Sequence, residues 1–150
     1  MAAKTSIEVS GLRELGESMR SLSAKVSTRI AVSATGAAAG IVKKATVSTI
    51  TRNPSVDTVS LRDSVIVKKL PKGQSQVTSE HIVTFRGRGK PYNKKGQRIA
   101  RAPHAHLVEF GTVNMPAEPS LRPAFDTEKR RAVDVMADRL RKGIAKATKS

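Results

Sequence analysis

The stretch HAHLVEFGTVNMPAEPSLRPAFD, residues 104–126, decides how the two halves of this chain are joined. The preceding Pro103 can begin a short helical turn that runs through Phe110 and buries Leu107 and Phe110. Gly111 can then take the left-handed backbone geometry that ends such a turn. Prolines at three later positions fix an extended crossing and aim the next helix: Pro116, Pro119 and Pro123. We interpret the stretch as a structural joint rather than as a reactive site.

An acid lies inside the apolar part of this joint, because Glu109 stands between Val108 and Phe110. A carboxylate in such a place is either half-exposed or paired, and in so basic a chain an arginine is the expected partner. Arg122 is the candidate, and the pair would pin the crossing within one subunit or between two. The residues assigned to the joint are Glu109, Phe110, Gly111, Pro119, Arg122 and Pro123.

Helical periodicity dominates the sequence before the joint. Apolar residues step by three and four positions from Leu12 onwards, and the pattern weakens near Ser21 and Ser23. Serine hydroxyls compete for backbone hydrogen bonds, so a break is expected there. The spacing predicts two helices end to end, over about residues 11–22 and 25–50.

The second of these helices has an unusual run of small side chains, ATGAAAG at residues 34–40. Small residues let another backbone approach closely, which predicts tight packing on a sheet or on a neighbouring subunit. After the joint, the apolar stripe predicts a further helix from Leu121 to about Ala147. Pro123 is tolerated in its first turn.

Alternating segments predict a small sheet. Residues 6–9 can form a short strand, and residues 61–70 and 77–85 predict an antiparallel hairpin around a turn at 71–73. One face of the second hairpin strand would carry Val77, His81, Val83 and Phe85. The predicted fold class is α+β: long N-terminal helices and a C-terminal helix packed on a small, mainly antiparallel twisted sheet, in one domain of 150 residues.

Composition limits the core and indicates the charge of the partners. Aromatic residues make up 3% of the chain, so a single subunit has few large anchors and a partner subunit could supply missing burial. The net charge of +16 favours a polyanion such as nucleic acid or an anionic membrane surface; solubility or an acidic neighbour protein is the alternative. Cysteine is absent, and we expect a soluble chain with neither a signal peptide nor a membrane span.

A basic segment at residues 86–101 is predicted to be a mobile, exposed loop, because it cannot bury much apolar area. It could contact phosphates without reading base sequence, or dock on an acidic partner, and the residues favour neither. Tyr92 could stack on a base, although a single aromatic is a weak signal. The cations assigned to DNA contact or docking are Arg86, Arg88, Lys90, Lys94, Lys95, Arg98 and Arg101.

The constellations that an enzyme needs are not found. The pattern H-x-H-x-x-E of His104, His106 and Glu109 could hold a metal, but its spacing fits neither a helix nor a strand face well. There is no phosphate-binding glycine loop, no nucleophile elbow and no paired acids for acid–base catalysis. We therefore expect a non-enzymatic protein without cofactor or metal.

Three motifs give a resemblance to a known family. They are GLREL at residues 11–15, LRDSV at 61–65, and HAHLVEFGT at 104–112 followed by MPA at 115–117 and PSLRPAF at 119–125. In this order they resemble the tail-completion, or head–tail joining, proteins of long-tailed bacteriophages of the lambdoid type. His104 stands where that family often has tyrosine, and Ser120 where phenylalanine is common.

The resemblance implies a ring-forming subunit in the neck of the virion, made in the host bacterial cytoplasm. Its ring would be hexameric or dodecameric, and would complete the tail end and join it to the head around the DNA channel. Implied partners are the head-side connector or adaptor, tail terminator or tube proteins, and the passing phage DNA, with no membrane. The alternative from the residues alone is a free basic nucleic-acid-binding protein, although no recognised binding motif is present.

Overall fold

The computed structural model describes residues 11–52, 59–70, 79–87 and 100–149, together with positions 92, 95 and 97; of Leu12 and Val59 it describes the backbone. The fold is mixed α and β. In chain order the elements are α1 (Leu12–Arg20), α2 (Ala24–Arg52), α3 (Val59–Ser64), β1 (Val65–Lys69), β2 (His81–Phe85), α4 (Ala105–Phe110) and α5 (Leu121–Thr148). The predicted α+β class is confirmed.

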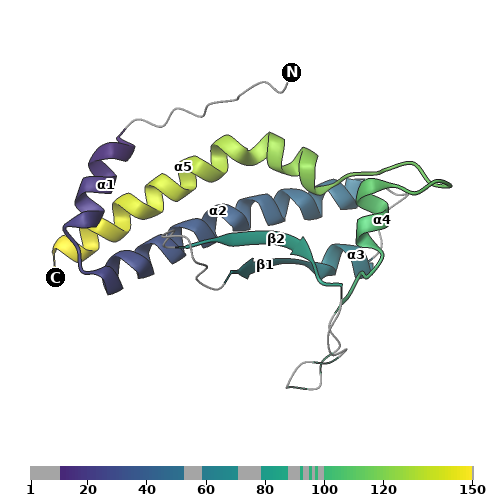
Figure 1. Cartoon of the computed structure of the whole chain (residues 1–150), viewed down its shortest axis with the longest axis horizontal. Helices are drawn as coiled ribbons and strands as arrows, with labels where there is room; N and C mark the ends of the chain where they lie inside the picture. Colours follow the sequence, from purple (N-terminus) through teal and green to yellow (C-terminus); the bar gives the residue numbers. More distant parts are fainter. Residues whose placement is uncertain are drawn as a thin grey trace.

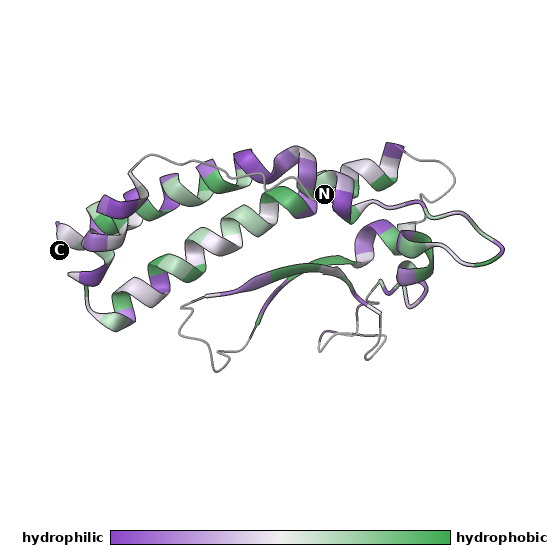
Figure 2. Cartoon of the chain, turned by 45° about the horizontal axis from the view of Figure 1, so that its top comes forward, coloured by the Kyte–Doolittle hydropathy of each residue, from purple (hydrophilic) through white to green (hydrophobic). Residues whose placement is uncertain are grey.

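Two long antiparallel helices, α2 and α5, lie side by side and form the frame of the molecule (Figure 1). Their contact is made by small or slim buried residues, among them Ala34 and Val42 of α2 and Ala132 and Ala137 of α5. Figure 2 shows that α2 carries mostly neutral and hydrophobic residues, whereas hydrophilic and hydrophobic turns alternate along α5. The helices predicted at 11–22, 25–50 and 121 to about 147 are confirmed to within a few residues.

The break between α1 and α2 forms at the expected serines. The hydroxyl of Ser21 donates a hydrogen bond to the carbonyl oxygen of Ser18 at 2.7 Å, and Ser21 ends α1. The backbone N–H groups of Val26 and Ser27 then donate to the carbonyl oxygen of Ser23 and start α2. This local competition between side chain and backbone is why one long helix becomes two.

A two-stranded antiparallel sheet packs against α2, which lies between the sheet and α5 in the view of Figure 1. The register pairs Val65 with Phe85, Val67 with Val83, and Lys69 with His81. The expected hairpin is thus confirmed in its pairing, and His81, Val83 and Phe85 share one face as predicted. The predicted strand at 6–9 and the turn at 71–73 lie outside the described residues.

The first hairpin strand is shorter than the sequence predicts. The prediction of strand from residue 61 is wrong, because residues 59–64 form α3. A helical turn places Leu61 and Val65 on the same side, and both are buried, with 2% and 1% of their surfaces exposed. The hydroxyl of Ser64 donates to the carbonyl oxygen of Leu61 at 2.7 Å and stabilises this turn. Likewise β2 begins at His81, and the described residues 79 and 80 lie outside the strand.

The core is small and lies where α2 ends over the sheet. Its buried members come from four segments: Ile50, Leu61, Val65, Ala102 and Ala105, with Val47, Val83, Phe85 and Val108 packed around them. Phe85 is the one aromatic in this cluster. The other three aromatics are more than half exposed, with Phe110 at 78%, Tyr92 at 57% and Phe125 at 53%. The chain therefore keeps large apolar side chains on its surface.

Helix α4 turns a different face to the core than the sequence predicts. Leu107 and Phe110 were expected to be buried, and both are exposed, by 40% and 78%. Ala105 is buried instead, and Val108 packs against the core cluster. Residues three apart share a helix face, and the small Ala105 lets the α4 backbone approach the core closely. The expected burial of Leu107 and Phe110 is wrong for this reason.

By length and composition alone, α2 is long and apolar enough to cross a bilayer, a test that the core helix of a soluble protein also passes. The helix packs against α5 and both strands, as a core helix does. Only 22% of its most apolar 18-residue window is buried within the chain. Most of the other residues between 30 and 50 are half-buried, and Val26 is the large apolar residue of α2 that is exposed.

Candidate docking groove and tongue

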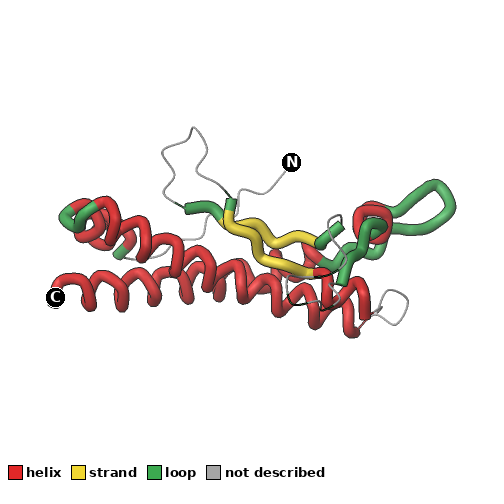
Figure 3. The backbone as a smooth tube through the Cα atoms, turned by 90° about the horizontal axis from the view of Figure 1, so that it is seen from below, coloured by secondary structure: helices red, strands yellow, loops and turns green. Residues whose placement is uncertain are grey.

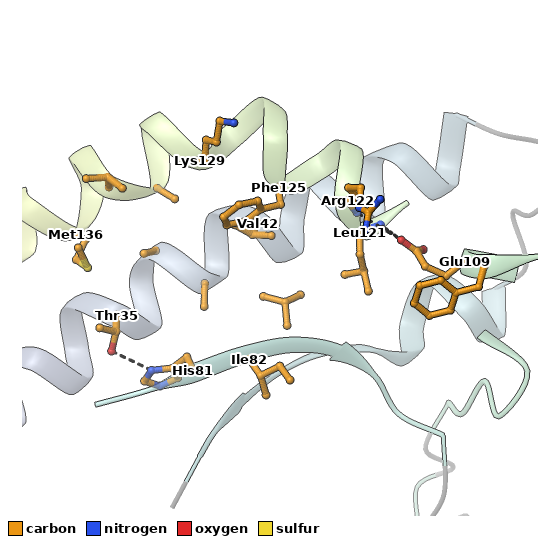
Figure 4. Close-up of a pocket in the computed structure, with 16 residues that line it drawn as sticks. Thr35, Val42, His81, Ile82, Glu109, Leu121, Arg122, Phe125, Lys129 and Met136 are labelled. Carbon is orange, nitrogen blue, oxygen red and sulfur yellow. Dashed lines mark hydrogen bonds between the residues drawn. The ribbon is translucent and has the colours of Figure 1, made fainter. Parts of the chain in front are cut away.

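The joint is held by a single carboxylate. The Oε2 atom of Glu109 accepts hydrogen bonds from the backbone N–H of Ser120 at 2.8 Å and from its hydroxyl at 3.1 Å. The Oε1 atom accepts the backbone N–H groups of Leu121 at 3.0 Å and Arg122 at 3.4 Å. Figure 4 shows the Glu109 carboxylate facing the start of α5. An acid from another segment therefore caps α5, whose first N–H groups have no partner inside the helix.

The predicted partnership of Glu109 with Arg122 has a different chemistry from the one expected. Arg122 contributes its backbone N–H, and the contact requires no guanidinium. Ser120 occupies the N-cap position without capping the helix by its own side chain, since its hydroxyl donates to Glu109 instead. Four converging hydrogen bonds satisfy the charge, so an arginine is not needed for it.

A narrow projection follows α4, and we call residues 111–119 the tongue. Gly111 opens it with φ 74° and ψ 179°, a positive φ as expected but with an extended ψ rather than left-handed helical geometry. Thr112 and Met115 pair across the tongue, and the N–H of Glu118 donates to the carbonyl oxygen of Val108 at 2.8 Å. The Thr112–Met115 bridge closes the tip of the tongue, and the bond from Glu118 to Val108 holds its two arms together at the base.

The tongue extends beyond the body of the molecule, at the end opposite the C-terminus (Figures 1 and 3). Val113 at its tip is completely exposed, at 103%, and Met115 is 41% exposed. Pro119 and Pro123, two predicted members of the joint, flank the start of α5 and are themselves exposed. Pro123 lies in the first turn of α5, as expected.

A groove of about 730 Å³ opens between α2, β2 and α5, and Figure 4 shows its side chains. Its lining is largely apolar and comes from these three elements and from the end of α4. We call it the groove; its apolar members are Ala38, Ala39, Val42, Ile82, Val83, Phe110, Leu121, Phe125, Ala132, Val133 and Met136, and its polar members are Thr35, His81, Glu109, Arg122 and Lys129. This size falls within the range of roughly 300–1,000 Å³ that is typical of ligand-binding pockets.

A polar contact fixes one end of the groove. The hydroxyl of Thr35 lies 2.9 Å from Nδ1 of His81 and 2.8 Å from the hydroxyl of Ser79. A Cβ atom placed on Gly36 would stand 3.4 Å from Nε2 of the same imidazole. The small residues of α2 thus let β2 approach closely, as the run at 34–40 predicted. His81 acts here as a packing and hydrogen-bonding residue between α2 and the sheet.

The predicted basic loop is seen chiefly at its ends. Arg86 donates its backbone N–H to the carbonyl oxygen of Ser64 at 2.8 Å, and its own carbonyl accepts the N–H of Ala102 at 2.9 Å. The hydroxyl of Ser60 donates to the carbonyl oxygen of Arg101 at 2.9 Å. The two ends of the loop are thus tied together beside α3. Lys95 is exposed, while Arg88, Lys90, Lys94 and Arg98 lie outside the described residues, and the mobility of the loop stays a prediction.

The candidate metal ligands do not converge. Nδ1 of His106 lies 3.0 Å from the carbonyl oxygen of Pro103, and the Glu109 carboxylate accepts hydrogen bonds from the start of α5. Within the described part of the chain no group of three or more His, Asp or Glu side chains could hold an ion. Near the end of α5, a hydrogen bond from Lys142 lowers the pKa of Asp138, a surface effect remote from the groove.

The long helical pair, the apolar groove and the projecting tongue leave several large apolar side chains exposed, among them Phe110, Val113 and Phe125. The sequence matches the profile of the HK97-gp10-like family, described as "Bacteriophage HK97-gp10, putative tail-component", over residues 13–111. The chain belongs to this family of bacteriophage tail components. A search of curated proteins and a search of solved structures each found no significant match. The family match extends from α1 to the glycine that opens the tongue, so the remainder of the tongue and α5 lie beyond it.

Proposed function

We propose that this protein is a ring-forming structural subunit of the phage neck, which completes the tail end and joins it to the head around the DNA channel. The family match, which makes the chain a phage tail component, carries the proposal. The neck position rests on the resemblance of the stretch at residues 104–125 to tail-completion proteins. No catalysis is part of the proposal.

The uncovered apolar surface supports a subunit that works in an assembly. The core contains few large side chains, while the groove and the tongue expose Ile82, Phe125, Phe110 and Val113. A soluble monomer rarely leaves so many large apolar groups together on its surface without a binding role. A hexamer or a dodecamer would cover them, with the head-side connector or adaptor on one face and tail terminator or tube proteins on the other.

Two measurements test this proposal. Light scattering coupled to size exclusion should find a closed oligomer of six or twelve subunits in the purified protein. Electron microscopy of a lysate from a phage that lacks the gene should show filled heads and complete-length tails that fail to join, with joining restored by supplied protein. Normal virions in that lysate, or absence of the protein from purified virions, would overturn the neck assignment.

A free nucleic-acid-binding protein is the second candidate, favoured by the net charge of +16 and by the tied, cation-rich loop at residues 86–101. It predicts DNA affinity that falls steeply as salt rises, because released counterions drive such binding. No binding at low salt would eliminate it. A basic ring around a DNA channel would also bind DNA, so the presence of the protein in virions separates the two.

A further inference from the structure

The cations of this chain are distributed unevenly, and the α2 and β2 walls of the groove come from stretches that contain none. The three longest stretches without Lys or Arg are residues 30–42, 73–85 and 102–121. They are far apart in the sequence, yet each contributes to the lining of the groove: Ala38, Ala39 and Val42 from the first, Ile82 and Val83 from the second, and Phe110 and Leu121 from the third. In a chain of net charge +16 this surface is therefore unsuited to a polyanion and suited to an apolar protein segment.

The tongue has the chemistry of such a segment. Residues 111–119 contain no Lys or Arg, and their one charged residue is Glu118. The side chain of Val113 is fully exposed at the tip, and Met115 follows it with 41% exposed. The bonds at the tip and the base of the tongue preorganise it, which lowers the entropy lost when it binds.

The tongue extends past the ends of α2 and α5, away from the body of its own chain (Figures 1 and 3), and none of its residues 111–119 lines the groove of the same chain. Its natural acceptor is therefore another copy. We propose that the groove receives the tongue of a second subunit, with Val113 and Met115 inserted between β2 and α5. This inference rests on the proposed oligomer and identifies its subunit contact. A groove of about 730 Å³ is ample for two side chains of this size.

The sign of the charges supports this contact. The groove carries Arg122 and Lys129 on the α5 side, opposite in sign to Glu118 of the incoming tongue, and Lys129 also pairs with Asp126 of α5 at 3.3 Å. Copies of net charge +16 repel each other, and a contact made through the cation-free tongue keeps that repulsion lower than one made through the basic loop. Salt screens the repulsion, so added salt should strengthen the oligomer, whereas it would weaken nucleic-acid binding.

The geometry of this contact is head to tail. The tongue of one subunit binds the groove of the next, so the two contact surfaces differ and the interface is heterologous. Such an interface closes into a ring when the rotation between neighbouring subunits permits it. Each subunit then uses its tongue once and its groove once. Every copy in a closed ring would have both surfaces covered, which is consistent with the amount of apolar surface that the single chain leaves open.

Photo-crosslinking tests the contact directly. A benzophenone amino acid replaces Val113 in the full-length protein, and the matched control carries it at the exposed Lys142, remote from the groove. Irradiation should give a covalent dimer with the 113 probe, and mass spectrometry should locate the link in α2, β2 or α5 residues of the groove. Links from position 113 to any other surface, or no covalent dimer, overturn the inference.

Two substitutions at neighbouring positions distinguish a loss of the subunit contact from a loss of folding. Val113→Asp should reduce the amount of oligomer at least tenfold relative to the parent protein at a fixed concentration. Asn114→Asp adds the same charge one residue away and should leave the amount of oligomer within twofold of the parent. Both positions are exposed, so both variants should keep the parent melting temperature. An intact oligomer of Val113→Asp overturns the tongue-in-groove contact alone, whereas a parent protein that stays monomeric at every salt concentration overturns both the contact and the proposed ring.

Discussion

The carboxylate of Glu109 accepts both the backbone N–H and the hydroxyl of Ser120, at 2.8 and 3.1 Å. Through this contact α4, the tongue and the start of α5 form one unit, although the two residues are separated by the whole tongue. The tongue is a loop closed at its base by a charged hydrogen-bond cluster. Its direction relative to α5 is consequently set by Glu109.

Removing the charge of Glu109 tests this role. Glu109→Gln retains one acceptor oxygen in place of two, and its NH₂ group faces donors, so hydrogen bonds to α5 are lost. The free energy of unfolding should fall by about 1.5–3 kcal/mol, the typical value of a hydrogen bond to a charged group. Urea denaturation measures it. Asp138→Asn, which removes an exposed acid of α5 and its surface ion pair with Lys142, serves as control and should have a much smaller effect. An unchanged melting temperature and oligomer in Glu109→Gln would refute the role.

Gly111 is expected to tolerate no side chain. Its φ of 74° is unfavourable for other residues, and a Cβ atom would stand 2.8 Å from the backbone nitrogen of Ala117 and 3.0 Å from the carbonyl oxygen of Met115. Gly111→Ala should cost about 1–3 kcal/mol, the range for a residue held in a sparsely populated backbone region. Thermal unfolding and light scattering measure the effect on the fold and on the oligomer. A variant with parent stability would show that the tongue opens without strain.

Two glycines of the long helices are expected to respond to alanine in opposite ways, Gly143 of α5 and Gly40 of α2. A Cβ atom at Gly143 would lie 2.7 Å from Cγ2 of Ile30, whereas one at Gly40 would meet nothing within 4 Å. Alanine favours a helix by about 1 kcal/mol over glycine, so Gly40→Ala should stabilise the protein by up to that amount. Gly143→Ala should destabilise it instead.

Combining the second substitution with a smaller partner checks the cause. Ile30→Ala removes the Cγ2 atom that the new Cβ would strike, so the double variant should be more stable than the sum of the single changes predicts. Chemical denaturation of all four proteins gives the coupling. Additive effects would mean that the helices adjust without a clash at this crossing.

The basic loop can be tested without touching the groove. Replacing Arg86, Arg88, Lys94 and Lys95 by serine removes four positive charges. If the loop docks on protein, neck assembly should fail; if it faces DNA, particles should assemble but retain or deliver DNA poorly. Infectivity and the DNA content of purified particles distinguish these outcomes. Particles of normal infectivity would contradict both roles of the loop.

The bounds of the long helices could be predicted from the sequence, because apolar spacing, interrupting serines and a proline in the first turn act within a few residues. The hairpin pairing and the positive φ of Gly111 followed from equally local signals. The same local reasoning failed at residues 61–64, where the core selects a helical turn for Leu61, and at α4, where it selects Ala105 and Val108 over Leu107 and Phe110.

By itself, then, the sequence determined the helices, the hairpin, the excess of positive charge and the family motifs, since each depends on neighbouring residues or on composition. Only the tertiary structure decided the partners of Glu109. The N–H groups that it binds are those of the first turn of α5, and the fold places that turn beside α4. The tertiary structure also decided the groove, because three cation-free stretches from distant parts of the chain meet there through the packing of α2 on β2 and α5. Such a surface has no local signature, since the distances that define it are created by folding.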